Sequence, residues 1–383
     1  MKFLFLVQGE GRGHLTQAIS MRQMLHEAGH TVVQILVGTA TERQIPDFFC
    51  EQIQTPIQYF RSPNLIVDAD GKVNFLNTFW HHIRRVGRYK QSLRQIDNAI
   101  AEHRPEVVVN FYEVLAGLYS LFYRSSVPVV CVGHQYLFLH SDFAFPAGRW
   151  FDRLLLLLVT RFTAIGAQKL LALSFRPMAH QPNRRVFVTP PLLRQEIKNT
   201  PTSFQNYLLV YVNYPHLVAQ VEAWHAQNQA VALHCFYDNK SSQQQEQQID
   251  ATLTFHQLNG EKFLKMMANC RALVTTAGFE SVGEALYFDK PTLMVPAHFE
   301  QLCNAVDAQM AGAGIGAATF DLSVLTNYLP HHQSVGDSFR HWYNSGSGLI
   351  VSQLENAGRP KHKQSWLKKN WPRRLNWQLG DVS

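Results

Sequence analysis

Short apolar runs along the first half of the chain alternate with longer stretches in which apolar and polar positions follow a helical period. The apolar runs predict buried strands near 2–7, 31–37, 106–111 and 127–132. The longer stretches predict helices near 14–28, 76–102, 113–124 and 148–172. Strands that alternate with helices indicate a parallel sheet.

A segment rich in proline and threonine interrupts this alternation between 189 and 202. Beyond it, the pattern predicts strands near 207–212, 230–236, 272–275 and 292–295, and the chain from about 337 onward reads as helical. We therefore expect an α/β protein with two Rossmann-like domains. Their expected bounds are 1–190 and 205–345, with 191–204 as the linker and 346–383 as a final helix with a basic aromatic tail.

The most informative motif lies between a strand that ends at Thr275 and a helix that begins after Gly278. The first N–H groups of a helix have no partner within it, so they can cradle a diphosphate, which the helix dipole also attracts. Gly278 lets a ligand approach the backbone closely, and Thr276 offers a hydroxyl donor. Glu284 lies further along the helix, where its carboxylate can reach the hydroxyls of a ribose. The motif therefore predicts a nucleotide lying across the helix.

A second apolar run and a polar loop that contains Glu300 and Gln301 follow this helix. A purely structural alternative exists, in which Thr276 and Gly278 only cap a helix before an ordinary turn. That alternative gives Glu284, Glu300 and Gln301 no reason to occur together.

A glycine-rich loop follows the first predicted strand, with Gly9, Gly11 and Gly13 alternating with other residues before His14. Strand, glycine loop and helix open many nucleotide-binding folds. The spacing differs from the dinucleotide fingerprint, because His14 stands where the last glycine of that motif would be. The next strand ends without the acidic residue that would hold an NAD ribose. A nicotinamide cofactor is therefore not expected.

From Thr275 to Asn304 the chain resembles the GT-B glycosyltransferases, in particular the branch of families 28 and 1 that includes the UDP-N-acetylglucosamine transferase of lipid II synthesis. The resemblance implies two Rossmann-like domains that face each other across a cleft, and a final helix that crosses back to the first domain. It also implies a role for each donor-site residue. These are a diphosphate cradle of Thr276, Ala277, Gly278 and Phe279, a ribose ligand in Glu284, and contacts to donor-sugar hydroxyls from Glu300 and Gln301.

The loop of Gly11, Arg12 and Gly13 resembles the motif that faces the cleft from the acceptor side in the same family. Imidazole has a pKa close to working pH, so His14 is the first candidate for the base that deprotonates an acceptor hydroxyl. Some relatives of the fold use a carboxylate, and Glu113, just beyond a predicted strand, is the second candidate. Either residue could instead have a purely local role at the start of a helix.

Length and composition suit a two-domain enzyme, because 383 residues exceed one comfortable core and 46% of them are hydrophobic. The five cysteines have no paired spacing, which indicates reduced, buried thiols in a cytoplasmic protein. The apolar start of the chain passes at once into the glycine loop, and so predicts a strand and not a signal peptide. The most apolar segment, Leu154 to Val159, is flanked by Arg153 and Arg161 and is too short to cross a membrane.

Two patterns that could suggest a metal are better explained otherwise. Asp68-Ala69-Asp70 spells the Asp-x-Asp of metal-dependent GT-A transferases, but the glycine that follows makes it a hairpin-turn signal. The chain has 18 histidines, including the neighbouring pairs at 81–82 and 331–332, and neither pair has a third ligand at suitable spacing. We expect neither a metal nor another cofactor.

The formal net charge is +7, and much of it gathers near the C-terminus, where basic residues are interleaved with tryptophan. These residues are Arg359, Lys361, Lys363, Lys368, Lys369, Arg373 and Arg374, with Trp366, Trp371 and Trp377. The mixture is typical of a segment that binds an anionic membrane surface. A tail that is only solvated is the alternative, and nucleic acid is not expected as a partner.

These features predict a cytoplasmic glycosyltransferase, peripheral on the inner face of the membrane, that moves a sugar from a UDP-linked donor to a hydroxyl of a cell-envelope glycan or glycolipid. His14 would take the proton of that hydroxyl, and transfer would proceed without a metal and with inversion at the anomeric carbon. One alternative is a nucleotide-sugar 2-epimerase, which needs no acceptor and no basic tail. The other is a non-catalytic nucleotide-sugar-binding or scaffold protein, in which His14 and Glu113 would be dispensable. These residues do not specify the sugar or the acceptor.

Overall fold

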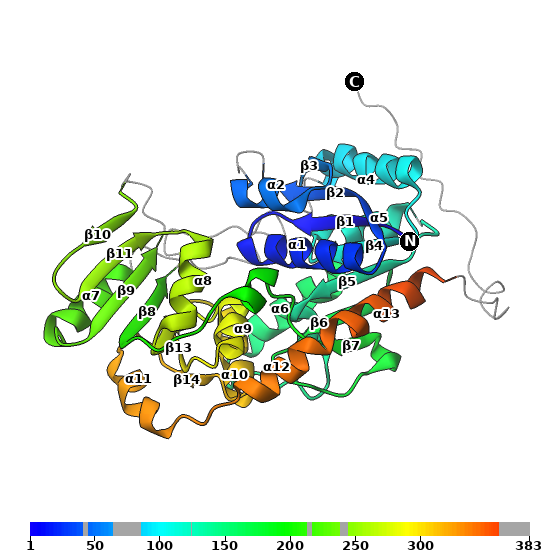
Figure 1. The fold of residues 1–383 in the computed structure, drawn as a ribbon. Coiled ribbons are helices and arrows are strands. Elements are labelled where there is room, and N and C mark those ends of the chain that lie inside the picture. The colour runs from blue at the N-terminus through cyan, green and yellow to red at the C-terminus, as the bar shows by residue number, and fades with distance from the viewer. Residues whose placement is uncertain (41–44, 64–85, 124, 213–216, 238–243, 360–383) are drawn as a thin grey trace.

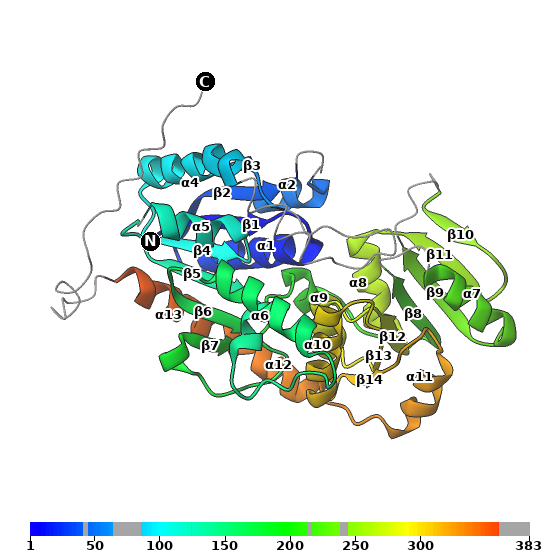
Figure 2. The ribbon, with the colours of Figure 1, turned by 180° about the vertical axis from the view of Figure 1, so that it is seen from behind.

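The computed structural model describes residues 1–40, 45–63, 86–123, 125–212, 217–237 and 244–359. In these ranges the chain forms two α/β domains, each built on a seven-stranded sheet, with α1 (Arg12–Glu27) and α9 (Phe279–Tyr287) between them (Figure 1). The view from behind shows α5 (Val114–Phe122) and α6 (Trp150–Thr163) over the first sheet (Figure 2). The prediction of two Rossmann-like domains is confirmed.

The first sheet is parallel throughout the described strands, in the order β3-β2-β1-β4-β5-β6-β7. Its strands are β1 (Lys2–Gln8), β2 (Thr31–Thr39), β3 (Ile57–Arg61), β4 (Val107–Phe111), β5 (Val129–Gly133), β6 (Ala167–Leu173) and β7 (Val186–Thr189). Along β1, Phe3 and Phe5 enter one core and Leu4 and Leu6 the other, so both faces are covered. The winding direction reverses between β1 and β4, and ligands of such sheets bind beyond the strand ends at this point.

The predicted helix near 148–172 is wrong in its second half, because α6 ends at Thr163 and β6 follows from Ala167. Gly166 lies between them with φ 76°, the left-handed conformation that glycine adopts without strain. The sequence of β6 contains Ala, Gln, Lys and Leu, which are good helix formers and give no strand signal. Its pairing between β5 and β7 therefore overrides its local preference.

The first half of the chain and the segment between the domains contain six further helices in the described ranges. They are α2 (Asp47–Ile53), η1 (Val86–Tyr89), α4 (Lys90–His103), η2 (His134–Leu139), η3 (Pro182–Arg184) and η4 (Gln195–Asn199). The predicted helix near 76–102 begins outside the described residues, and its described part forms η1 and α4.

The second sheet has the order β10-β11-β9-β8-β12-β13-β14, with β10 antiparallel to β11 and the other pairings parallel. Its strands are β8 (Tyr207–Val212), β9 (Ala232–Tyr237), β10 (Glu246–Gln248), β11 (Leu253–Gln257), β12 (Ala272–Thr275), β13 (Thr292–Met294) and β14 (Gly314–Gly316). Its helices, besides α9, are α7 (Val218–Gln227), α8 (Gly260–Asn269), α10 (Phe299–Met310), α11 (Ser323–Tyr328) and η6 (Leu329–His331). The last two helices, α12 (Gly336–Asn344) and α13 (Gly346–Gly358), complete the described chain.

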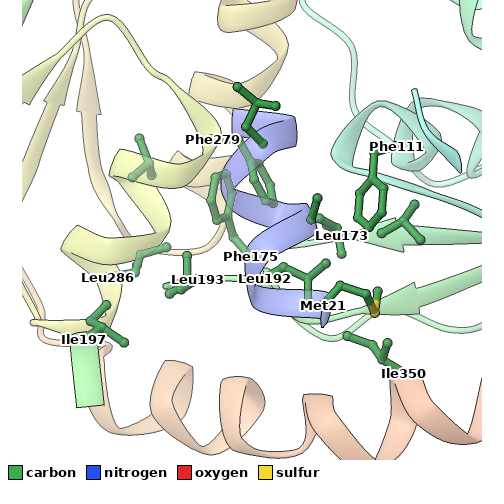
Figure 3. Close-up of a cluster of buried hydrophobic side chains, with 14 of the residues drawn as sticks. Met21, Phe111, Leu173, Phe175, Leu192, Leu193, Ile197, Phe279, Leu286 and Ile350 are labelled. Atoms are coloured by element: carbon green, nitrogen blue, oxygen red, sulfur yellow. The ribbon is translucent and has the colours of Figure 1, made fainter. Parts of the chain in front are cut away.

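Apolar contact joins the two domains through α1. One cluster of buried side chains contains residues of both sheets and of α1 and α9. Figure 3 shows Phe111 and Leu173 from the first sheet on one side of α1, with Phe279 and Leu286 of α9 on the other. The domains are therefore in close contact in this conformation.

Helix α13 leaves the second domain and packs across the first sheet (Figure 1). Ile350, Leu354 and Ala357 are buried in the same cluster as the strands of that sheet. The Lys169 ammonium on β6 donates to the side-chain and backbone oxygens of Gln353, at 2.8 and 2.9 Å. This helix is thus part of the core of the first domain.

A glycine sets the distance between α5 and α6, which gives a direct test of their packing. A Cβ at Gly117 would overlap the Phe162 carbonyl oxygen, a backbone atom that cannot move aside. Gly117→Ala should therefore lower the free energy of unfolding by about 3 kcal/mol, measured by urea denaturation. Gly348→Ala on α13, where a Cβ meets no heavy atom within 4 Å, is the control and should raise stability by up to about 1 kcal/mol. Equal effects of the two variants would contradict this account of the contact.

Candidate functional site

Helix α9 begins with an uncapped first turn at the end of β12. Gly278 is its N-cap residue and offers no side chain to the first N–H groups of the helix. Ala277 before it is buried and has φ 61°, a left-handed conformation that turns the chain sharply from strand into helix. The Asn304 amide of α10 donates to the Ala277 carbonyl at 3.3 Å and holds the turn. Thr276 is fully buried beside it.

The space beside Gly278 is open on the side where other residues carry a Cβ. If Gly278 carried a Cβ, that atom would have one described heavy atom within 4 Å besides those of the adjacent residues. This atom is the Ser281 hydroxyl oxygen, at 3.3 Å. That hydroxyl donates to the Gly278 carbonyl at 3.0 Å. A ligand can therefore approach this backbone closely, and the N–H groups and dipole of the helix favour an anion.

The start of α1 faces this region from the first domain and carries His14 in its first turn. Gly11 is the N-cap residue, and a Cβ there would meet nothing within 4 Å. The His14 ring is 7% exposed and stacks on Tyr112 with ring centres 5.7 Å apart. Its Nε2 lies 3.4 Å from the Gln135 amide nitrogen. An amide nitrogen can only donate, so Nε2 is the acceptor and carries the lone pair of the neutral ring.

Burial lowers the pKa of His14, and the nearby His134 lowers it further, although Glu280 and Glu300 act in the opposite direction. The ring is therefore neutral at neutral pH and can accept a proton. Glu280 lies in the first turn of α9 and Glu300 in the first turn of α10. His14 is thus close to the starts of two helices of the other domain.

Two residues that follow β5 link the domains through Glu300. The His134 Nε2 lies 2.9 Å from the Glu300 Oε1, and the Gln135 amide donates to the same oxygen at 3.1 Å. Burial acts to raise the pKa of Glu300, but the hydrogen bond and charge of His134, with His298 and His14, lower it to about 2. Glu300 is therefore an anion shared by both domains.

The first turn of α9 makes a second set of contacts with the first domain. The Phe279 ring lies between His134 and Phe175, with ring centres 4.6 and 4.4 Å away. The Gln17 amide of α1 donates to the Glu280 Oε1 at 2.7 Å. A Cβ at Gly13 would lie 2.6 Å from the other oxygen of Glu280, so glycine permits this approach.

Glu284 lies deeper on α9 and is bound by Arg194 from the segment between the domains. The Arg194 Nε and Nη2 donate to the two carboxylate oxygens at 2.6 and 3.0 Å, and Glu284 is 1% exposed. Burial raises the pKa of Glu284, while Arg194 opposes the shift. In this conformation Glu284 is buried behind this bidentate contact, so a ribose could reach its carboxylate only if the contact rearranged.

Glu113 belongs to a different set of contacts. It is the N-cap residue of α5, where its Oε1 accepts a bond from the Leu115 N–H at 2.9 Å and another from the Ser62 hydroxyl. Its side chain is fully buried against Gly38, and burial raises its pKa to about 7. The cap draws this side chain inward, at the start of a helix as the local alternative supposed. The structure does not bring Glu113 together with His14.

The other predicted residues have local partners. The Gln301 Oε1 accepts the Ala297 N–H at 2.9 Å at the start of α10, and the Gln301 side chain is buried. The Arg12 guanidinium lies over the Phe48 ring, 5.5 Å from its centre. Arg12 therefore reaches toward α2, and Gln301 supports the loop that presents Glu300.

The sequence interpretation missed three residues that build this interface. His134 and Gln135 follow the apolar strand β5 directly, and the rule that ligands gather at strand ends, applied to Glu113, could have found them. Arg194 stands in the predicted linker and carries no motif. Only the fold reveals that it reaches Glu284.

The remaining sequence features are the patterns that could suggest a metal, the basic tail, possible membrane spans and the cysteines. Asp68, Asp70 and the histidines at 81–82 lie outside the described residues, as does the tail from 360 onward. Within the described ranges, the structure contains no group of three or more His, Cys, Asp or Glu side chains suited to a metal. Nor does any helix there have the length and apolar character needed to cross a membrane. Four cysteines are buried and free, as predicted, whereas Cys50 is exposed.

Comparison with known proteins finds one family and many similar folds. A family model described as "Glycosyl transferase family 1" matches residues 1–331. Among solved structures, the chain is similar to LpCGTa in complex with UDP, at 13% identity over 94% of this chain and 99% of the other, with a TM-score of 0.64. No curated protein matches this chain.

Two further structures carry other ligands. The chain is similar to Phytolacca americana UGT2 complexed with UDP-2fluoro-glucose and pterostilbene, at 12% identity over 94% of this chain and 100% of the other, with a TM-score of 0.62. It is also similar to the spinosyn rhamnosyltransferase SpnG complexed with thymidine diphosphate, at 14% identity over 93% and 100%, with a TM-score of 0.57. At such identities the likeness shows the fold alone, and it confirms the predicted GT-B architecture.

Proposed function

Because the chain belongs to glycosyl transferase family 1, we propose that it moves a sugar from a nucleotide-sugar donor to an acceptor hydroxyl at the interface of its two domains. The observation that carries the proposal is the position of His14 beside the first turns of α9 and α10. The first domain supplies a neutral base there. The second supplies an uncapped helix start for a diphosphate.

The donor would lie with its diphosphate at Thr276 to Phe279, where the space beside Gly278 is open. The N–H groups and dipole of α9 would stabilise the charge that develops on the departing diphosphate, so no metal is needed for that task. Glu284 would bind the ribose, and Glu300 with Gln301 the sugar hydroxyls. For this, the contacts of Arg194 with Glu284 and of His134 with Glu300 must rearrange.

His14 would act on the acceptor. The acceptor hydroxyl takes the place of the Gln135 amide at Nε2 and gives its proton to that nitrogen. Its oxygen attacks the anomeric carbon as the bond from that carbon to the phosphate oxygen breaks, and the electron pair leaves with the diphosphate. A direct attack inverts the anomeric carbon. Glu280 and Glu300 then favour the protonated ring electrostatically.

The domains would open and close during this cycle. Gln17 with Glu280 and His134 with Glu300 form polar links across the interface, and such links can break and re-form in water at small net cost. The segment 189–204 is the proposed hinge, although Leu192, Leu193 and Ile197 within it are buried. Motion there would couple donor binding to assembly of the site.

Two observations bear on the classes of donor and acceptor. UDP and thymidine diphosphate in the names of structures with this fold favour a nucleoside diphosphate sugar. The run from Thr275 to Asn304 supports the lipid II branch, hence a UDP-sugar and a cell-envelope glycan or glycolipid at the cytoplasmic face of the membrane. The family match favours transfer over epimerisation and over a non-catalytic role.

Calorimetric titration of UDP-, GDP-, TDP- and CMP-sugars into the intact protein tests the donor site. One class should bind, and its slow hydrolysis should continue in EDTA. Gly278→Ala should fold normally, because the new Cβ meets only Ser281, yet weaken donor binding about tenfold by blocking close approach to the backbone.

Gly348→Ala, remote from the site, should bind the donor as the wild type does. If no nucleotide sugar binds the intact protein, the donor role of Thr276 to Gln301 is lost. If Gly278→Ala binds as tightly as the wild type, the diphosphate does not lie against that backbone.

A further inference from the structure

Helix α6 exposes a row of large apolar side chains, although its opposite face is already buried on the first domain. The exposed residues are Trp150 (73%), Phe151 (42%), Leu154 (43%) and Leu158 (51%). The buried face contains Leu156, Thr160 and Thr163. A helix that is apolar on nearly all sides and still exposed indicates contact with something other than water.

The end of α5 extends this row. Leu121 is 50% exposed and Phe122 is 63% exposed. The two helices are in contact, since Gly117 of α5 packs on the Phe162 carbonyl of α6, and they lie side by side in Figure 2. We define the α5–α6 patch as these two residues with Trp150, Phe151, Leu154 and Leu158. It holds six of the ten most exposed large apolar side chains of the described chain.

The charges beside the α5–α6 patch are mainly positive. Arg149, Arg153 and Arg161 are exposed on or next to α6, and Asp152 is the one acidic residue of the two helices. Asp152 pairs with Arg149 at 2.6 Å, so two arginine charges remain in excess. Three arginines less one aspartate give a local charge of +2, and the sequence pI is about 9.1.

The patch begins next to the proposed site. The Arg149 guanidinium lies over the Phe299 ring, 5.6 Å from its centre, and Phe299 precedes Glu300 in the first turn of α10. Helices α6 and α10 are also in contact. Trp150, which follows Arg149 at the same end of α6, is therefore the part of the patch next to the start of α10.

We propose that the α5–α6 patch docks the protein on an anionic lipid bilayer. Helix α6 would lie in the plane of the interface, with Trp150, Leu154 and Leu158 entering the headgroup region and Arg153 and Arg161 contacting lipid phosphates. Tryptophan is favoured at that depth, because its ring is apolar and its N–H is polar. This orientation brings the α10 side of the proposed site to the membrane surface, where a lipid-linked acceptor would be held.

A second copy of the chain suits this surface less well. In a symmetric dimer the same patch meets itself, so the arginines of one copy would face those of the other. Like charges brought together oppose association, whereas anionic headgroups attract all three arginines. The membrane therefore satisfies both the apolar row and its basic flank. Only the acceptor in this inference depends on the proposed function, and binding to lipid can be measured without any turnover.

Co-sedimentation of the full chain with vesicles tests the docking surface. The wild type should bind vesicles of phosphatidylcholine with phosphatidylglycerol and bind phosphatidylcholine alone much more weakly. Trp150→Glu/Leu154→Glu should lower the partition coefficient for the anionic vesicles about tenfold or more. Phe204→Glu/Met310→Glu, at side chains that are 72% and 52% exposed outside the patch, is the matched control and should bind as the wild type does.

Calorimetric titration of the donor into each variant shows whether the fold and the donor site are intact. The proposal is overturned if the wild type does not bind anionic vesicles. It is equally overturned if the Trp150→Glu/Leu154→Glu and Phe204→Glu/Met310→Glu variants bind them equally well. It is also overturned if sedimentation velocity shows a wild-type dimer that the Trp150→Glu/Leu154→Glu variant loses while vesicle binding is unchanged. If vesicle binding behaves as expected but no nucleotide sugar binds, the docking surface stands and the proposed function fails.

Discussion

Replacing His14 by alanine is expected to leave donor binding intact and to lower kcat for sugar transfer by about 10²- to 10⁴-fold. The imidazole is the group that the structure places at the domain interface with its Nε2 lone pair facing the Gln135 amide, which an acceptor hydroxyl can replace. Alanine removes the base and adds no bulk to the first turn of α1. Donor affinity by calorimetry and kcat with a saturating acceptor separate the two effects.

The transfer rate of the wild type should also depend on pH in a way that reports the protonation of His14. Burial lowers the pKa of His14 from its ordinary value of 6.5, so the base is still deprotonated at pH 6.5. The rate should therefore hold as the pH falls to 6.5 and decline only below it, and the His14→Ala variant should lack this limb. His26→Ala, an exposed histidine on the same helix, is the control and should behave as the wild type does.

The opposite pattern would give the role of base to the other candidate. If His14→Ala retains transfer and Glu113→Gln loses it while both variants stay folded, the proton goes to the carboxylate. Glu113→Gln must be compared by denaturation as well, because Glu113 caps α5 and its loss also costs stability.

Replacing Arg194 by alanine is expected to lower the free energy of unfolding by about 3–5 kcal/mol, because it leaves the buried carboxylate of Glu284 without its partner. The Arg194 side chain is 24% exposed and that of Glu284 is 2% exposed, so water cannot readily replace the bidentate contact. Urea denaturation at pH 7 measures the loss. Lowering the pH should reduce the difference from the wild type, since burial raises the pKa of Glu284 and protonation removes its charge.

Two further variants test whether this loss of stability comes from the buried charge of Glu284. The double variant Arg194→Met/Glu284→Met should recover most of the stability, because neither charge then remains buried. Lys265→Ala breaks an exposed ion pair with Glu261 and should change stability little. If Arg194→Ala is as harmless as Lys265→Ala, the pair contributes nothing to the contact between linker and α9.

The sequence predicted the architecture where apolar runs are long and contain valine or phenylalanine. β1, β4, β5 and β8 all have this character, and they form the centres of both sheets. β6 was not predicted because its residues prefer helix. β14 was not predicted because Gly-Ile-Gly has no strand signal, and its pairing with β13 is what makes it a strand.

In the candidate site, too, local sequence determines the positions of some residues and contacts between distant segments determine those of others. Gly278 and His14 stand at helix starts, and local sequence is enough to place them. Arg194 meets Glu284 across 90 residues of chain, and Gln17 meets Glu280 across 263. Such pairs depend on how the domains pack, which no short motif encodes.

Helix α13 also has a consequence for the way this chain folds during synthesis. Ile350, Leu354 and Ala357 fill the core of the first sheet but leave the ribosome after the whole second domain. A separate apolar cluster lies wholly within the second domain, between Leu208 and Leu325, and can close before α13 emerges. Domains made first usually fold first. Here the face of the first sheet that α13 covers can close only after the last helix emerges, so we expect the cluster between Leu208 and Leu325 to form before it.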